Sequence, residues 1–180
     1  MSHMFVPGPV DVAPEVLAAQ AKPMLPHRSK DFEEIFRRNE ERAKKLFYTQ
    51  YRIFQGACSG SGMQEAGIRN FVQQDVLSCV NGAFAQRWHD VAIANGKQAD
   101  KLEVEFGEAI TPELLRDALK KKHYEAVTIV HNETSTGVQN PLPELCKVVQ
   151  EVSPDTLILV DAVSSLGGVK IEMEDRKSVV

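Results

Sequence analysis

The chain has 180 residues, of which 43% are hydrophobic and 26% charged, and its formal net charge is -4. A chain of this length buries roughly 70% of its extended surface, so one domain with a real core is expected. The acidic balance disfavours a protein that binds nucleic acid through phosphates. No apolar run approaches the ~20 residues of a membrane span, and residues 1–4 lack the apolar core of a signal peptide.

Three cysteines, Cys58, Cys79 and Cys146, are odd in number and widely separated. Disulfide frameworks and zinc sites use paired or closely spaced ligands, so we expect three reduced thiols in a cytoplasmic protein. His131 has one close carboxylate, Glu133, and no H-x-x-x-H spacing. We therefore predict no metal site.

The N-terminal part is predicted to be an arm. Pro7 and Pro9 exclude a helix there, and a short helix is expected after Pro14, so residues 1–28 are assigned to this arm. A longer helix is predicted from Ser29 to Tyr48, because apolar residues recur at helical spacing along it: Phe32, Ile35, Phe36, Ala43, Leu46 and Phe47. Its charged residues fit a solvated helix face with i,i+4 pairs.

From Tyr51 onward, short apolar runs alternate with helical patterns. The runs predict strands at 51–54, 75–80, 101–105, 126–130 and 156–160, and helices at 63–71, 84–95, 112–121 and 143–151. Thr111 is expected to cap a helix with Pro112 in first position, and Gly96 to end the helix before it. Residues 29–180 therefore predict one α/β domain with a largely parallel sheet and flanking helices.

Asp161 directly follows the apolar run 157–160. A carboxylate at the carboxyl end of a buried parallel strand points into the crevice where open α/β sheets bind ligands. There it could hold a cationic ring nitrogen. Magnesium binding in a nucleotide hydrolase is the alternative, but the chain has no G-x-x-x-x-G-K-[ST] loop to accompany it.

Three further segments are expected at the same edge. Glycines within 57–66 open a helix and let backbone N–H groups approach a phosphate, although a ligand-free tight turn explains them equally well. Phe84 could offer a ring face or simply pack in the core. Hydroxyls within 134–136 could bond a phenolic oxygen or only cap a turn. Together these groups suit a flat phosphorylated aromatic cofactor with a basic ring nitrogen.

Five motifs resemble the class V aminotransferases of the serine–pyruvate and alanine–glyoxylate type, in matching order: Pro7-Gly8-Pro9, Gly60-Ser61-Gly62, Asn81-Gly82-x-Phe84, His131-x-Glu133-Thr134-Ser135-Thr136-Gly137-Val138-x-Asn140-Pro141 and Val160-Asp161-Ala162-Val163-Ser164-Ser165-Leu166-Gly167-Gly168. The resemblance runs from about residue 5 to residue 174 and covers about the first half of a typical member. It implies pyridoxal 5'-phosphate held on the large domain of the aspartate-aminotransferase-like fold (fold type I), here incomplete.

Residue by residue, the resemblance implies a phosphate cradle at Ser61, Gly62 and Met63. Met63 stands where relatives often carry a hydroxyl or imidazole, so contact there would use its backbone N–H. Phe84 would stack on the pyridine ring, and Thr134 would face the phenolic oxygen.

The same resemblance places Asp161 against the ring nitrogen and Val163 against the opposite ring face. A carboxylate there keeps the pyridinium protonated, so the ring can accept electrons from the substrate's α-carbon. Gly8, His27 and Arg28 would contact substrate, since an arginine fork suits phosphate or carboxylate. For His27 and Arg28, a structural role at a helix start or at a subunit contact is the alternative.

The family's Schiff-base lysine is expected well after Asp161, whereas the sequence stops at Val180. Lys177 comes too early and lacks the Ser-x-Lys context. We therefore expect no catalytic lysine and no small C-terminal domain in these 180 residues, and no activity from them alone.

The resemblance implies transfer of an amino group between an amino acid such as serine or alanine and a 2-oxo acid such as pyruvate or glyoxylate, by a full-length homodimer. Two alternatives stay open. One is phosphoserine transamination or another class V reaction such as desulfuration. The other is a non-catalytic cofactor-binding or dimerisation fragment.

Overall fold

The computed structural model describes residues 3–171, 173 and 178–179. Its centre is a parallel sheet in the order β2-β1-β3-β6-β7. These strands are β1 (Asp75–Val80), β2 (Gln98–Glu103), β3 (Ala126–Val130), β6 (Leu157–Asp161) and β7 (Ser178–Val179). The predicted fold class is confirmed.

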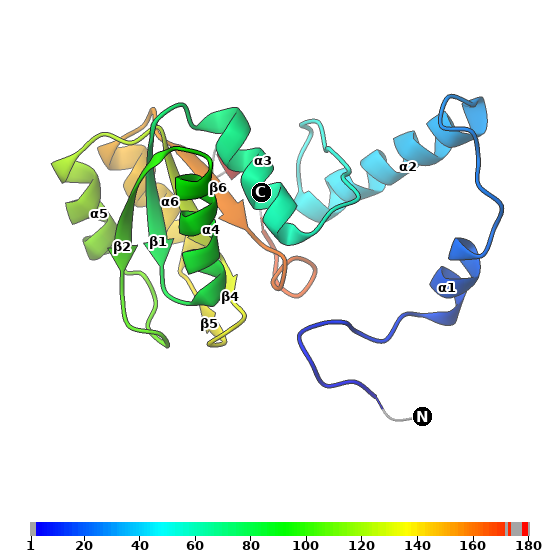
Figure 1. Cartoon of the computed structure of the whole chain (residues 1–180), viewed down its shortest axis with the longest axis horizontal. Coiled ribbons are helices and arrows are strands. Elements are labelled where there is room, and N and C mark those ends of the chain that lie inside the picture. Colours follow the sequence, from blue (N-terminus) through cyan, green and yellow to red (C-terminus); the bar gives the residue numbers. More distant parts are fainter. Residues whose placement is uncertain (1–2, 172, 174–177, 180) are drawn as a thin grey trace.

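Helices cover both faces of the sheet (Figure 1). One face packs on α3 (Gly60–Phe71) and α4 (Ala83–Ala94), the other on α5 (Pro112–Lys121) and α6 (Leu142–Val152). Side chains alternate between faces along each strand, because successive strand residues point in opposite directions. In β3, Val127 and Ile129 face α5 and α6, whereas Ala126 and Val130 face α3 and α4.

The chemically argued helix boundaries are confirmed. Thr111 Oγ1 accepts the backbone N–H of Leu114 at 3.3 Å, with Pro112 in the first position of α5. Gly96 follows the end of α4 with φ of 72°, a left-handed conformation that favours glycine. These boundaries depend on neighbours in sequence, which is why local patterns predict them.

The strand predicted at residues 51–54 is wrong. This segment belongs to the connection between α2 (Lys30–Phe47) and α3, and Tyr51 and Phe54 are 70% and 85% exposed. Short apolar runs form strands only where a neighbouring strand pairs with them, and none does so here among the described residues. The glycine-containing turn therefore enters α3 without a preceding strand.

Two further differences concern β-structure. Strand β2 begins at Gln98, three residues before the predicted position, because its polar edge residues hid the alternation. The segment after β3 forms a small antiparallel hairpin of β4 (Asn132–Glu133) and β5 (Val138–Gln139), which was not predicted. Both strands are two residues long, below the length at which alternation is visible.

The N-terminal arm and its helices stand away from the sheet (Figure 1). The predicted helices are confirmed as α1 (Pro14–Gln20) and α2, but neither contains a buried residue. The apolar stripe of α2 is consequently exposed, with Phe32 at 37% and Phe36 at 38%. None of the helices in the described part of the chain is long and apolar enough to cross a membrane.

Candidate functional site

Asp161 ends β6 at the carboxyl edge of the sheet and is half-buried. Its Oδ2 accepts the Nε2–H of Gln64 at 2.7 Å, and its Oδ1 accepts the backbone N–H of Val163 at 3.0 Å. The two donors fix the carboxylate between α3 and the loop after β6. A carboxylate has about four acceptor positions, so the group keeps acceptor capacity for a ligand N–H.

Sequence reasoning missed Gln64, which is only 4% exposed. Its Oε1 is buried and has no hydrogen-bond partner among the described residues. Gln64 lies four residues before buried Ile68, on the inner face of α3. The sequence does carry a signal for Gln64, because a glutamine stands there at a position that the helical pattern predicts to be apolar.

The first turn of α3 presents backbone N–H groups toward this edge. Ser59 is the N-cap, and its carbonyl oxygen accepts the N–H of Gly62 at 3.0 Å and of Met63 at 3.3 Å. The N–H groups of Gly60 and Ser61 precede any available intrahelical acceptor. An anion at this end would therefore meet the N–H groups of Gly60 and Ser61 first. The N–H groups of Gly62 and Met63 already donate to Ser59, and their contact with a phosphate stays a prediction.

Val163 lies beside the same turn. A Cβ on Gly60 would come within 3.2 Å of Val163 Cγ2, so the loop after β6 closely approaches the start of α3. The Val163 side chain is 75% exposed. The structure thus brings Val163 to the edge where the sequence predicted it.

Phe84 lies in the first turn of α4 and is half-buried. The guanidinium carbon of Arg87 sits 5.1 Å from its ring centroid, and Arg87 Nη1 donates to Ser61 Oγ at 3.4 Å. Arg87 therefore links the ring to the start of α3 and adds positive charge beside the free N–H groups. A ligand that stacks on Phe84 has to use the other ring face or displace Arg87.

Thr134 faces the loop after β6. Its Oγ1 donates to Ser164 Oγ at 2.8 Å, and Ser164 Oγ donates to the carbonyl of Asn132 at 2.9 Å. Ser164, which was not predicted, thus joins the segments that follow β3 and β6. Donation from Thr134 to a phenolic oxygen would require its proton to turn away from Ser164.

His131 is buried with both ring nitrogens in polar contacts. Its Nδ1 lies 3.0 Å from Ser165 Oγ, and its Nε2 lies 3.4 Å from Gln139 Nε2. Within the described residues, no group of three or more His, Cys, Asp or Glu side chains could hold a metal ion. The contacts indicate that His131 tethers the loops after β3 and β6.

The predicted substrate residues lie elsewhere in the single chain. His27 and Arg28 line a hollow of about 410 Å³ at the start of α2, together with Phe32 and Arg52. Gly8 lies in the exposed arm, which stands away from the sheet (Figure 1). The structure does not bring these residues to Asp161, and their substrate role stays a prediction.

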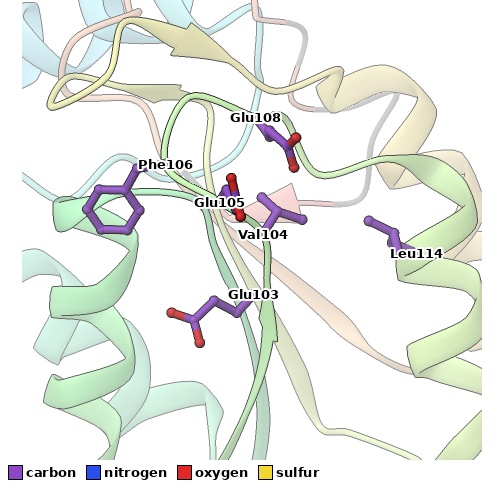
Figure 2. A pocket seen from close by; sticks show the side chains of 6 residues that line it. All are labelled: Glu103, Val104, Glu105, Phe106, Glu108 and Leu114. Atoms are coloured by element: carbon purple, nitrogen blue, oxygen red, sulfur yellow. The ribbon is translucent and has the colours of Figure 1, made fainter.

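A larger hollow of about 630 Å³ lies at the end of β2, and Figure 2 shows the side chains that line it. Its lining is acidic and apolar: Glu103, Val104, Glu105, Phe106, Glu108 and Leu114. Three carboxylates without a lining cation disfavour a phosphate. The hollow therefore does not suit the predicted cofactor, whose expected contacts gather across the ends of β1, β3 and β6.

The segments that form this edge are 57–66, 81–88, 131–137 and 161–168, and their sequences contain no lysine. Lys177, considered and disfavoured above as the tethering lysine, lies outside the described residues.

Comparison with known proteins connects this geometry to a family. The chain is 40% identical over 168 residues to an uncharacterized aminotransferase of Methanocaldococcus jannaschii, covering 92% of this chain and 43% of the relative. It is 34% identical over 182 residues to serine–glyoxylate aminotransferase of Methylorubrum extorquens, covering 98% and 45%. Both relatives are thus more than twice as long as the matched part.

The fold comparison agrees with the sequence comparison. The crystal structure of alanine–glyoxylate aminotransferase from Nostoc sp. superposes with a TM-score of 0.90 at 31% identity, over 96% of this chain and 46% of that one. Residues 15–178 match the profile of the aminotransferase class-V family. The chain therefore belongs to the class V aminotransferases, and it spans less than half the length of these relatives.

Proposed function

We propose that this chain forms the cofactor-binding part of a pyridoxal-phosphate transaminase that moves an amino group between serine or alanine and a 2-oxo acid such as pyruvate or glyoxylate. One observation carries the proposal. Asp161 is held by Gln64 and Val163 at the sheet edge, beside a helix start with free N–H groups. The names of the two glyoxylate aminotransferase relatives support this substrate class.

The residues present fit the cofactor. The N–H groups of Gly60 and Ser61 would hold its phosphate, aided by the positive end of α3 and by Arg87. Phe84 would cover one ring face, and Val163 the other. When bound, the cofactor supplies an electron sink for charge that develops at the substrate's α-carbon.

Asp161 would accept the ring N–H and keep that nitrogen protonated. Gln64 and Val163 fix the orientation of the carboxylate before the ligand arrives, which reduces the ordering cost of binding. We infer that the hydroxyl of Thr134 donates to the phenolic oxygen once its hydrogen has turned away from Ser164 Oγ.

We further infer that the 180 residues bind the cofactor without a covalent link and do not turn over substrate alone. The edge segments named above contain no lysine to tether the cofactor or move the α-proton. A cytoplasmic location is part of the proposal. Cys58 and Cys79 are free thiols, and burial raises the pKa of the Cys79 thiol to about 12.

The experiment is a titration of the purified chain with pyridoxal 5'-phosphate, followed by absorbance and by borohydride reduction with mass spectrometry. Asp161→Ala should weaken binding by about tenfold, because it removes a charge-assisted hydrogen bond worth about 1.5 kcal/mol. Asp155→Ala, in the exposed turn before β6, is the matched control and should bind normally.

Equal affinity of Asp161→Ala and the unaltered chain would refute the proposed cofactor contact. A reduced covalent adduct on Lys177 would refute the inference that binding is non-covalent.

Phosphoserine is the second candidate substrate, favoured by the hollow where His27, Arg28 and Arg52 gather. These groups would recognise a phosphate through charge-assisted hydrogen bonds. Phosphoserine should then shift the NMR signals of this hollow more strongly than serine does, and Arg28→Ala should abolish the difference.

A further inference from the structure

The first turn of α4 is capped by side chains that lie far away in the sequence. Its N-cap, Gly82, has no side chain to accept the N–H groups of residues 83–85. Two residues of the β4–β5 hairpin, 48 to 52 positions along the chain, accept them instead. Ala83 donates to Ser135 Oγ at 3.0 Å, Phe84 to Glu133 Oε1 at 3.4 Å and Ala85 to Glu133 Oε2 at 3.0 Å.

Glu133 is completely buried, with 0% exposure. Its Oε1 also accepts the backbone N–H of Ser135 at 3.1 Å and the hydroxyl of Ser135 at 2.7 Å. A buried carboxylate is stable only where such donors replace its lost hydration. The positive end of the α4 dipole adds to this stabilisation.

The backbone at Gly82 leaves no space for another side chain. A Cβ there would overlap Cγ and Cδ of Glu133 and come within 2.7 Å of Ser135 Oγ. Glycine is therefore needed for close approach, so that the carboxylate can reach the helix start.

We propose that Glu133 is a positioning residue of the candidate cofactor site. The turn that it caps carries Phe84, and the residue that follows it in the β4–β5 hairpin is Thr134. One buried side chain therefore fixes the position of the Phe84 ring relative to the Thr134 hydroxyl, which would face the phenolic oxygen. Glu133 acts through these two residues and does not touch the ligand. The inference rests on the proposed function.

The first measurement is residue-resolved amide hydrogen exchange on the ligand-free chain. Glu133→Gln should speed exchange at Phe84 and Ala85 by about tenfold, because one acceptor oxygen becomes a donor group. Glu113→Gln is the matched control, since Glu113 is an exposed glutamate in the first turn of α5. It should leave exchange in α4 unchanged.

The second measurement is pyridoxal 5'-phosphate binding, followed by quenching of Trp88 and by circular dichroism of the bound ligand. Trp88 is the chain's single tryptophan and lies in α4. Glu133→Gln should weaken binding by about tenfold and alter the dichroism signal. Ser135→Ala alters an exposed residue and removes the cap of Ala83 together with one hydroxyl donor to Glu133, while both carboxylate oxygens stay in place. It should show a smaller change of the same sign, even where Glu133→Gln does not fold.

The outcomes separate the two proposals. Unaltered binding and dichroism in both variants, with the unaltered chain binding normally, would overturn the role of Glu133 alone. Unchanged exchange at Phe84 and Ala85 in a folded Glu133→Gln chain would overturn it as well. An unaltered chain that does not bind the ligand would overturn the proposed function together with the inference.

Discussion

Gln64 has two opposing effects on stability. Its Nε2 donates to the carboxylate of Asp161 at 2.7 Å, while its Oε1 is buried without a partner among the described residues. A hydrogen bond to a charged group contributes about 2 kcal/mol, and an unpartnered buried acceptor costs about the same. The residue is therefore nearly neutral for folding, and its main effect is the orientation of Asp161.

We expect Gln64→Met to change the free energy of unfolding by less than about 1 kcal/mol but to weaken pyridoxal 5'-phosphate binding, because Asp161 loses one of its two orienting donors. Gln64→Glu should destabilise the fold by about 3 kcal/mol at pH 7, since it places a buried carboxylate against the half-buried carboxylate of Asp161. Urea unfolding and ligand titration measure the two effects.

Gln55→Glu is the control for the charge change, because Gln55 is exposed. Equal stability of the Gln64→Glu and Gln55→Glu chains would show that Gln64 does not face Asp161 as described.

At the scale of elements, a polar cluster joins the amino-terminal halves of β1 and β2 to the segment before β3, away from the candidate site. Lys122 Nζ lies 2.6 Å from Asp75 Oδ1 of β1 and 3.0 Å from Asp100 Oδ2 of β2. Tyr124, two residues before β3, donates its hydroxyl to Asp100 at 3.0 Å. Burial and this hydrogen bond raise the pKa of Tyr124 to about 12, and the hydrogen bond from Lys122 lowers the pKa of Asp100.

The raised pKa of Tyr124 predicts a loss of stability at alkaline pH. In the folded chain the phenol stays neutral at pH values above the usual tyrosine pKa near 10. Its contribution to the free energy of unfolding is therefore complete below about pH 10 and disappears as the pH approaches 12. Tyr124→Phe should cost about 1.5 kcal/mol at pH 7 and flatten this alkaline decline. Urea unfolding across pH 7 to about 11 tests it.

Tyr51→Phe is the matched control, because Tyr51 is 70% exposed. An alkaline decline of the same steepness in Tyr124→Phe as in the unaltered chain would contradict the assignment.

At the scale of the whole molecule, α2 is an amphipathic helix without a covering partner in the described chain. Phe32 and Phe36 pair along it with ring centroids 6.5 Å apart, and both remain more than a third exposed. On the charged face, Arg37 bridges Glu34 and Glu41. Exposed apolar stripes of this kind mark interaction surfaces, and we propose a second copy of the chain as the occupant, in line with the homodimer that the family resemblance implies for the full-length protein.

Light scattering after size exclusion should therefore detect dimers. The double change Phe32→Ser with Phe36→Ser should weaken dimerisation by about a hundredfold, because two aromatic side chains that the dimer would bury are lost. Arg38→Ser, on the charged face of α2, should have little effect. A chain that stays monomeric at all concentrations would contradict the proposal that a second copy covers α2.

Much of the architecture was predictable because its signals are local. Apolar runs predict β1, β3 and β6 because these parallel strands are buried on both faces, and the limits at Gly96 and Thr111 follow from glycine conformation and hydroxyl capping. Asp161 could be placed at a strand end by the same reasoning. Segment 51–54 was mispredicted because the same short apolar pattern also occurs in connections that no strand pairs with.

By itself, then, the sequence determined the fold class, the family and which strand ends carry chemical groups. The tertiary structure decided which groups meet. Gln64 reaches Asp161 across 97 residues, and Glu133 reaches the start of α4 across 48. Such contacts depend on how helices pack on the sheet, and no periodicity or spacing within one segment encodes the partner at that distance.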